Sequence, residues 1–338
     1  GFYLPFKQDY TVEGFSTVVW KGNDAANHYI GGTGFQPDWT WIKKRDAAGS
    51  HAIFDSVRGA TKYLSSNQTA AESTQATTHK SWSADGFTVG SDGASNSSSN
   101  NYVAWNWDMG GSNATNTAGS ITSTVRANAS YGQSIVSYTG ISGAAQTIGH
   151  GLSSAPEMIF VKNRGLNDEW VVYNHSIGNE KYLRLDSTAA LADEIYWNDT
   201  TPTDALFSVG NHRIVNSGSY TYIAYCFHSV TGYSKFGTYN GTGNASGNSV
   251  TLGFEPAFLM IKATTGAYTW AIFDNVRTKD AKLSAESSGA ESILDYTDFT
   301  STGFNLTTTH PNANGSGQSY IYMAFADKRE YAYWLDQS

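Results

Sequence analysis

The sequence predicts an all-β protein of three tandem antiparallel β-sandwich repeats, jelly-roll-like and about 100 residues each. Three observations support this prediction: a strand that recurs after a proline, a closing strand that recurs at similar offsets, and the absence of long helix-forming windows. Short apolar stretches alternate with Gly and Asn turns along the chain, which is typical of antiparallel sandwiches. One all-β barrel per unit is the alternative.

The first recurring element is a turn with Gly and Pro, followed by an apolar run that ends on a lysine. Its copies lie at 34–43, 151–162 and 253–262, and their prolines are about 120 and about 100 residues apart. Proline has a fixed φ and no N–H to donate, so it belongs at the start of a strand. The run shows no polar alternation, and we therefore expect a strand that is buried on both faces.

Two further landmarks recur at nearly the same offsets. A closing strand reads Tyr-Val-Ala-Trp at 102–105, Tyr-Ile-Ala-Tyr at 222–225 and Tyr-Met-Ala-Phe at 322–325. A Phe-Asp-x-Val-Arg string occurs at 54–58 and again at 273–277. Three landmarks at one set of offsets predict the triplication of a single unit.

Within the first repeat, the expected strands follow one another in a regular order. The repeat opens at 15–22, where β-branched and aromatic residues dominate. A hairpin turn at 47–49 separates the strand after the proline from a returning strand at 51–58. Another strand lies at 82–89, and the polar loop at 91–101 should be exposed. The opening strands of the later repeats are expected at 134–140 and 235–241.

These elements set the predicted segment boundaries. The segments are an N-terminal arm (1–13), repeat 1 (14–109), a linker (110–133), repeat 2 (134–230), repeat 3 (231–330) and a C-terminal tail (331–338). The linker is low in apolar residues, whereas the bridge between the second and third repeats is short. We therefore expect repeats 2 and 3 to pack closely and repeat 1 to hang on a longer tether. The chain begins without Met, so it is expected to be a fragment, a processed product or the ordered part of something longer.

Composition and charge argue against several classes of protein. Charged residues are 15% of the chain, where about a quarter is usual, and aromatic residues reach 14%, a profile of β-rich extracellular or virion-surface proteins. The net charge is −8 and the 21 Lys and Arg residues form no basic cluster, which argues against nucleic-acid binding. No apolar run approaches the length of a membrane span. The single cysteine, Cys226, excludes an internal disulfide framework and is expected to be buried in a closing strand.

The chain has no motif typical of catalysis or of cofactor binding. Its eight histidines are dispersed, and neither a phosphate-binding Gly-x-x-x-x-Gly-Lys loop nor Gly-x-Ser-x-Gly occurs. The Asp/Arg pairs at 55–58 and 274–277 are interpreted as ion pairs that fix a strand end, because the second repeat has Tyr173 and Ser176 at the equivalent positions. We therefore predict a protein that is not an enzyme and that has no cofactor and no metal.

Aromatic side chains outside the predicted core strands are the candidates for ligand binding. Trp82, Trp197 and Trp334 lie in less regular segments, and Asn198 and Asp199 follow Trp197 directly. The apolar face of a sugar ring stacks on an aromatic ring, while its hydroxyl groups bond to amides and carboxylates. These five residues are the predicted glycan contacts.

Several strings of this sequence resemble a known viral domain. They are 57–64, 85–90, 102–107, 121–128, 134–140, 149–152, 222–227 and 232–237. Together they are similar to the repeated, largely uncharacterised domain of tail-fibre and other virion structural proteins of tailed phages, especially phages of marine bacteria and cyanobacteria. The resemblance covers essentially the whole chain. It implies a virion surface protein, trimeric like many fibres, and it supplies no catalytic residues.

We accordingly expect a tail fibre or adhesin that contacts host surface polysaccharide through loops such as 91–101, 192–203 and 307–318. Weak contacts would be multiplied by repeat number and by assembly into a homotrimer or other homo-oligomer. The other expected partners are virion proteins, without nucleic acid or membrane insertion. Two alternatives remain: a purely structural capsid decoration or fibre shaft, and a glycan depolymerase, which needs two carboxylates flanking one glycosidic bond.

Overall fold

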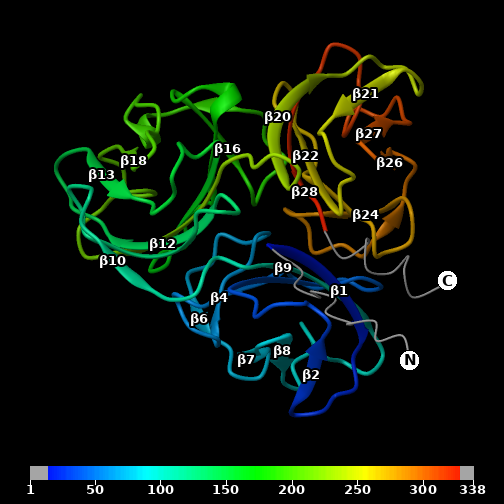
Figure 1. The fold of residues 1–338 in the computed structure, drawn as a ribbon, viewed down its shortest axis with the longest axis horizontal. Coiled ribbons are helices and arrows are strands. Elements are labelled where there is room, and N and C mark those ends of the chain that lie inside the picture. The colour runs from blue at the N-terminus through cyan, green and yellow to red at the C-terminus, as the bar shows by residue number, and fades with distance from the viewer. Residues whose placement is uncertain (1–13, 328–338) are drawn as a thin grey trace, which may run out of the picture.

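The computed structural model describes residues 14–327, which form three lobes around a common centre (Figure 1). We define the lobes as residues 14–109, 110–230 and 231–327. Every pairing between the named strands is antiparallel, and short 3-10 turns supply the helical residues of this part of the chain. The prediction of an all-β fold with antiparallel sheets is therefore confirmed. The expected arm at 1–13 and tail at 331–338 lie outside the described residues.

Short strands build all three lobes. The first lobe contains β1 (Phe15–Lys21), β2 (His28–Gly31), β3 (Trp39–Lys44), β4 (Ala52–Asp55), β5 (Lys62–Tyr63), β6 (Ser73–Thr74), β7 (His79–Ser83), β8 (Gly86–Val89) and β9 (Asn101–Trp107). The second contains β10 (Ala114–Asn116), β11 (Ser123–Asn128), β12 (Gln133–Thr139), β13 (Gln146–Gly149), β14 (Met158–Asn163), β15 (Val171–Asn174), η1 (His175–Ile177), β16 (Lys181–Arg184), β17 (Ala192–Asp193), η2 (Ile195–Trp197), β18 (Leu206–Val209) and β19 (Thr221–Phe227). The third contains β20 (Ser234–Asn240), β21 (Asn248–Thr251), β22 (Phe258–Ala263), β23 (Ala271–Asp274), β24 (Ala281–Ser284), β25 (Ser292–Ile293), β26 (Thr297–Thr300), β27 (Gly303–Leu306) and β28 (Ser319–Phe325). None of the described helices is long and apolar enough to span a membrane.

Each lobe has a large sheet with the same strand order at its centre. The orders are β1-β9-β3-β4, β12-β19-β14-β15-β16 and β20-β28-β22-β23-β24. The strand after the proline therefore lies between the closing strand and the returning strand in all three lobes. A smaller sheet faces each large one: β2-β8-β7, β13-β18 and β21-β27-β26. An apolar cluster fills the space between the two sheets of each lobe, which gives a sandwich-like arrangement.

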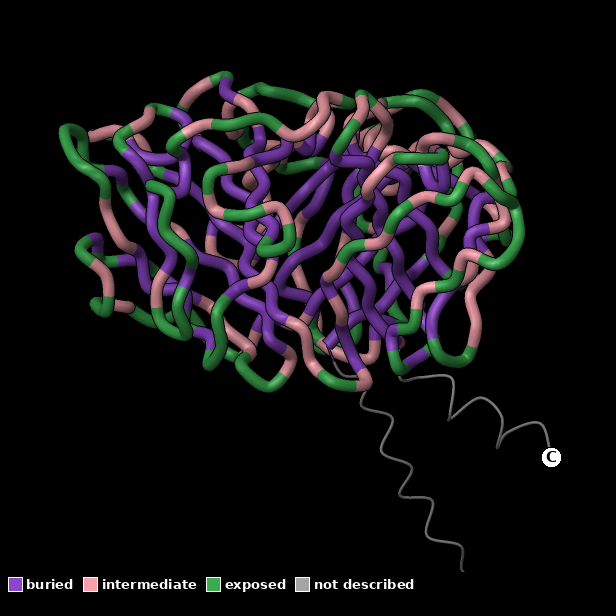
Figure 2. The backbone as a smooth tube through the Cα atoms, turned by 90° about the horizontal axis from the view of Figure 1, so that it is seen from above, coloured by how far each residue is buried: buried purple, intermediate pink, exposed green. Residues whose placement is uncertain are grey.

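Each large sheet has a second face, which points away from the small sheet of its lobe. These faces of the three large sheets meet in one central core. The ring of Phe15 stacks on that of Phe325 with centroids 5.5 Å apart, and Trp39 stacks on Tyr225 at 4.5 Å. Figure 2 shows buried backbone running through the middle of the molecule, with exposed segments at its margins. The large sheets are thus buried on both faces, as their unbroken apolar runs predict. The expectation that the first repeat hangs on a tether is wrong, because its aromatic residues help to build the common core.

The predicted linker at 110–133 is also wrong, because much of it is sheet. β11 pairs along its whole length with β12, and β10 pairs with β11. Arg126 of β11 reaches the first lobe, where its Nε lies 2.9 Å from Oδ1 of Asp38. Ser123 and Val125 are buried while Thr124 is exposed. The low apolar content of this segment therefore reflects an edge hairpin with one solvated face.

The register of the third closing strand differs from the sequence alignment by two residues. Phe325 pairs with the first residue of β22, as Trp107 does with β3 and Phe227 with β14. The counterpart of Tyr102 is therefore Tyr320 and not Tyr322. A shift of two residues keeps every side chain on the same face of the strand, so the apolar pattern alone does not distinguish the two registers. Buried Cys226 of β19 is confirmed as a core residue.

Candidate functional site

The structure places Trp197, one of the predicted glycan contacts, in the interior. Trp197 is 1% exposed, its Nε1 donates to the carbonyl oxygen of Lys181 at 3.0 Å, and its ring contacts Tyr173. The short helix η2 folds the side chain beneath the chain, so this ring has no face to offer a sugar. Trp82 is half-buried on the inner face of the small sheet, where its Nε1 donates to Oγ1 of Thr40 at 3.2 Å.

The remaining predicted contacts are not brought together with a tryptophan face. Asn198 and Asp199 are exposed and have φ of 51° and 46°, so they form the left-handed turn that ends η2. The backbone carbonyl of Asp199 accepts a hydrogen bond from Asn179 at 3.0 Å. These two residues therefore have a structural turn role. Trp334 lies outside the described residues.

The polar loops before the closing strands are anchored, and only partly exposed. Ser95 and Asn96 of the loop at 91–101 are fully buried, which corrects the expectation of a solvated loop. Asn96, Asn216 and Asn314 occupy the same place in the three lobes, and Oδ1 of each accepts a backbone N–H from a neighbouring loop at 2.7–3.0 Å. The second-lobe counterpart of 91–101 is therefore 211–221, which the sequence reading missed. The segment 192–203 holds β17 and η2 instead.

A tyrosine fixes each of these loops to its closing strand. The hydroxyl groups of Tyr102, Tyr222 and Tyr320 donate to loop carbonyl oxygens at 2.9, 2.7 and 2.7 Å. Each ring also stacks on an aromatic side chain of the opening strand, with centroids 4.8–5.5 Å apart. The loops are thereby held as three equivalent, rigid surfaces. The alignment of Tyr102 with Tyr222 in the sequence already places the missed loop directly before the second closing strand.

Three buried lysines join the lobes in a closed cycle. Lys43, Lys162 and Lys262 are fully buried near the ends of β3, β14 and β22. We call each boundary between two lobes a seam. The Nζ atoms donate across the seams to carbonyl oxygens: Lys43 to Ser288 (3.3 Å), Lys162 to Thr69 (2.9 Å) and Lys262 to Thr188 (3.0 Å). Burial lowers the pKa of each lysine to about 8.

A buried ring beside each lysine makes a second contact across the seam. Nε1 of Trp170 donates to the carbonyl of Ser65 at 2.8 Å, and Nε1 of Trp270 donates to that of Arg184 at 2.7 Å. In the first lobe His51 takes this position, and its Nε2 lies 3.0 Å from the carbonyl of Ser284. The indole N–H of Trp41 donates to Nδ1 of His51 at 2.7 Å, and an indole can only donate. Nδ1 is therefore the acceptor, and Nε2 of His51 carries the proton.

Ion pairs reinforce two of the seams and are missing from the other. Arg45 binds Glu291 between the first and third lobes, with Nη2 and Oε1 2.9 Å apart. Arg164 binds Glu72 between the second and first lobes in the same way, with Nε and Oε2 2.8 Å apart. At the seam of the second and third lobes the corresponding residues are Thr264 and Leu191, joined by a backbone hydrogen bond of 3.0 Å.

The Asp/Arg pairs are structural ion pairs, as predicted. Both are fully buried at the ends of β4 and β23, and the carboxylate of Asp55 also accepts the backbone N–H of the arginine at 2.8 Å. The hydroxyl of Tyr225 donates to Asp55 at 2.7 Å, and Nε1 of Trp105 donates to Asp274 at 2.9 Å, so each pair serves a seam. The strand register makes Asn174 the counterpart of Asp55, which corrects the alignment with Tyr173.

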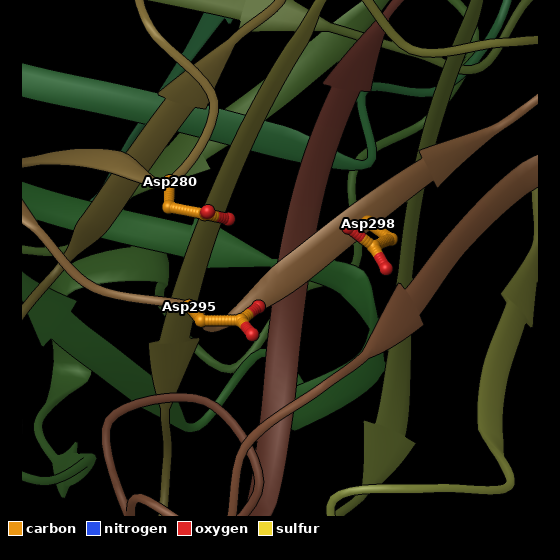
Figure 3. Close-up of side chains that lie close together, drawn as sticks. All are labelled: Asp280, Asp295 and Asp298. Carbon is orange, nitrogen blue, oxygen red and sulfur yellow. The ribbon is translucent and has the colours of Figure 1, made fainter.

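Three carboxylates in the third lobe form an acidic cluster, drawn in Figure 3. Oxygen atoms of Asp280, Asp295 and Asp298 lie within 4.8 Å of one another, beside a cleft of about 300 Å³. Nζ of Lys279 is 2.7 Å from Asp298, and Oγ1 of Thr307 donates to Asp295 at 2.6 Å. Burial, with repulsion from the other two carboxylates, raises the pKa of Asp280. The cluster is thus partly neutralised by a lysine and a hydroxyl group.

Comparison with known proteins identifies one family. A family described as a domain of unknown function (DUF7483) matches residues 11–329. No curated protein and no solved structure matches the chain. Because the match spans nearly the whole chain, from before the first described strand to beyond the last, the protein belongs to the DUF7483 family of domains of unknown function.

Proposed function

We propose that this protein is a virion surface component of a tailed phage, a tail fibre or adhesin, that binds host surface polysaccharide through its loops. The observation that carries the proposal is the position of the anchored loops relative to the ends of the described chain. The loops precede the first residues of β9, β19 and β28. Phe15 and Phe325 stack on each other near the opposite ends of these strands. A strand of seven residues is about 20 Å long, so this distance separates the loops from the two phenylalanines.

This arrangement suits an attachment protein. The described chain begins and ends on one side of the closing strands, and three equivalent polar loop sets stand on the other. Rigid loops lose little conformational entropy on binding, and three related surfaces on one chain multiply weak contacts. The sequence strings that resemble virion proteins add independent support. Other virion proteins and further copies of the chain are the proposed partners.

We also propose that the three lobes are tandem jelly-roll-like sandwich repeats. The shared strand order, the equivalent lysines and the equivalent loop asparagines support this proposal. In each lobe the opening strand lies in the large sheet and the next strand in the small sheet, and the last strand of the lobe lies in the large sheet again. The returning hairpin, for example β3 with β4, stays in the large sheet and is the departure from a jelly roll.

The proposal is tested with the whole protein on an array of bacterial surface polysaccharides, together with immuno-electron microscopy of phage particles. Saturable binding and label at the tail tips are the expected results. Label on the capsid or on a fibre shaft, with no binding, would favour a purely structural role. Light scattering on the purified chain measures whether a trimer forms.

A second candidate, a glycan depolymerase, is favoured by the acidic cluster beside the cleft of the third lobe. Retaining glycosidases place two carboxyl groups about 5 Å apart, one of them an acid of raised pKa. Release of reducing ends from host polysaccharide, abolished by Asp280→Asn, would support cleavage. We propose binding without cleavage, because Lys279 engages Asp298 and compensates the negative charge.

A further inference from the structure

Tyr29 differs from the other aromatic residues of the described chain in its exposure. It is 53% exposed, and among residues 14–327 every other Phe, Trp and Tyr side chain is buried or half-buried. Tyr29 lies on β2, at the outer face of the small sheet of the first lobe. Its neighbour Ile30 points inward and is part of the core of this lobe.

The ring of Tyr29 is held in place across the sheet. Its hydroxyl group donates to the backbone carbonyl of Asp85 at 2.7 Å, in the turn between β7 and β8. Gly31 lies beneath the ring, because a methyl group there would come within 2.8 Å of Cε1 of Tyr29. The absence of a side chain at Gly31 therefore gives the ring its position. The tyrosine is ordered before any ligand arrives, which reduces the entropy lost on binding.

Hydroxyl groups flank the ring on the same face. Thr88 pairs with Tyr29 across β2 and β8, and Ser81 pairs with Thr88 across β8 and β7, so the three side chains form one outward row. The row behind it, Ile30 and Phe87, faces the core. An apolar ring beside hydroxyl groups matches the alternation of apolar faces and hydroxyl edges on a sugar.

The charged groups near the ring are already engaged. The carboxylate of Asp85 accepts the N–H groups of Gly32 and Gly34 at 3.3 and 2.6 Å. Nζ of Lys80 donates to the carbonyl of Ala26 at 3.0 Å and to the side chain of Asn27. The surface therefore offers no unengaged charge that would select an ionic ligand, and it is complementary to an uncharged one.

The fold itself does not require an aromatic residue at this position. Thr147 of β13 and Ser249 of β21 hold the same place in the small sheets of the other two lobes. Ser249 pairs with a polar residue, Asn305, as Tyr29 pairs with Thr88. A small hydroxyl residue thus suffices for this strand, and the ring of Tyr29 adds exposed apolar surface without adding to a core.

We infer that Tyr29, Thr88 and Ser81 form a carbohydrate-stacking platform that binds a pyranose ring of a neutral glycan. The apolar face of the sugar lies on the tyrosine ring, and its hydroxyl groups bond to the threonine and the serine. This inference rests on the proposed function and adds to the loops a further contact on the strands of a small sheet. It assigns the binding to the small sheet of the first lobe, away from the tryptophans that the sequence suggested.

The test measures binding of the whole protein to immobilised neutral hexasaccharides of glucose, mannose and galactose, with an anionic hexasaccharide alongside. Tyr29→Ser introduces the residue that the third lobe has naturally, and it should raise Kd for the bound neutral sugar roughly tenfold. Gly31→Ala should weaken binding similarly, because the new methyl group displaces the ring. Tyr29→Phe keeps the ring but loses the hydrogen bond that orders it, so it should weaken binding less than Tyr29→Ser does.

Ile293→Ser is the matched control, since it removes a side chain that is 62% exposed in the third lobe. It should leave Kd unchanged, and all variants should keep the wild-type unfolding temperature. Sugar binding that persists at full affinity in both Tyr29→Ser and Gly31→Ala would overturn the platform while leaving the proposed function intact. A protein that binds none of these sugars and no host polysaccharide would overturn both.

Discussion

Lys162 is a fully buried cation, and each of its hydrogen bonds goes to a backbone carbonyl oxygen. Its Nζ donates to Thr69 across the seam at 2.9 Å, and to Leu166 and Asp168 within its own lobe at 3.2 and 2.8 Å. Lys162→Met keeps the length of the side chain but leaves these acceptors without their donor. We expect a loss of about 2–4 kcal/mol in the free energy of unfolding, measured by urea denaturation.

Lys21→Met is the control for this substitution, because Lys21 is exposed on β1. It should change the free energy of unfolding by less than about 0.5 kcal/mol. Equal effects of the two substitutions would contradict a structural role for the buried ammonium group.

Buried carboxyl and ammonium groups give stability an unusual dependence on pH. Burial raises the pKa of Asp38 to about 7 and that of Asp186 to about 6, so the folded protein holds protons that the unfolded chain has lost. Their contribution is fully present below pH 4 and is lost as pH rises to about 7. For the lysines of pKa about 8 the unfolded chain holds more protons above pH 8, so stability rises there.

The buried imidazoles of His51 and His79 oppose these carboxyl groups, because burial lowers their pKa to about 3 and the unfolded chain takes up protons at them below about pH 6.5. The lysines alone among these groups titrate between about pH 8 and pH 9, so we expect a rise there in the free energy of unfolding. Urea denaturation at each pH measures it. Between about pH 4 and pH 7 the free energy of unfolding of Asp38→Asn should rise relative to that of the wild type, since the amide does not titrate and the loss due to Asp38 is removed. A difference between the two proteins that stays constant over this range would show that Asp38 does not titrate there.

At the scale of the elements, the three seams show two solutions to one packing problem: an Arg–Glu ion pair at two of them and an uncharged pair at the third. Arg45 and Glu291 form a bidentate pair with side chains 17% and 18% exposed, whereas Thr264 and Leu191 stand in the same place at another seam. Arg45→Thr alone or Glu291→Leu alone should cost about 1–2 kcal/mol. The first leaves Glu291 with only its longer contact to Arg277, at 3.4 Å, and the second leaves Arg45 without its carboxylate. The double variant should be more stable than the sum of the singles by about 1 kcal/mol.

Denaturation of the four proteins in this double-mutant cycle gives the coupling free energy. Additive effects would mean that the two side chains do not interact in solution. The same cycle at Arg164 and Glu72 provides an internal replicate, since that pair has the same geometry at a different seam.

Elements with a local signal could be predicted from the sequence, and pairings could not. The strands after Pro37, Pro156 and Pro256 carry an unbroken apolar run, and they are buried as expected. The edge hairpin of β10 and β11 has one polar face, so its composition resembles that of a linker. The segment 82–89, predicted as one strand, is divided between β7 and β8, which pair as a hairpin around the turn at 84–85.

The candidate site shows the same limit. Exposure of Tyr29 depends on the glycine beneath the ring and on the turn that receives its hydroxyl group, 56 residues further along the chain. No spacing in the sequence encodes that contact. Trp197 is the converse case, because a short helix turns a tryptophan from a polar segment into the core.

For the whole molecule, the central core makes the three lobes interdependent. Phe325 contacts Phe15 of the first lobe, Phe227 of the second and Phe258 of the third. Phe325→Ala should cost about 3–5 kcal/mol and should speed hydrogen exchange in all three large sheets. Scanning calorimetry of the wild type should give a single unfolding transition. Separate transitions, or faster exchange confined to the third lobe, would contradict one shared core.

This closure was beyond prediction because it joins the two ends of the described chain. Phe15 and Phe325 are separated by nearly the entire sequence, and nothing local marks them as neighbours. The unbroken apolar runs gave an indirect indication: strands buried on both faces need a layer of protein on each side of the sheet. The other two lobes supply that layer, and no additional chain is needed.

The meeting of both ends at Tyr233 has a mechanical consequence. A side chain at Gly14 would overlap the ring of Tyr233, and the N–H of Ala326 donates to the carbonyl of the same tyrosine at 2.7 Å. Any polypeptide joined to either end of the described chain therefore leaves from the same place, beside Tyr233, and the molecule would be attached on that one side. Tension along such a polypeptide would act on β1 and β28, which the ladders to β9, β20 and β22 hold in their sheets, while the loops on the opposite side of the molecule would bear none of it.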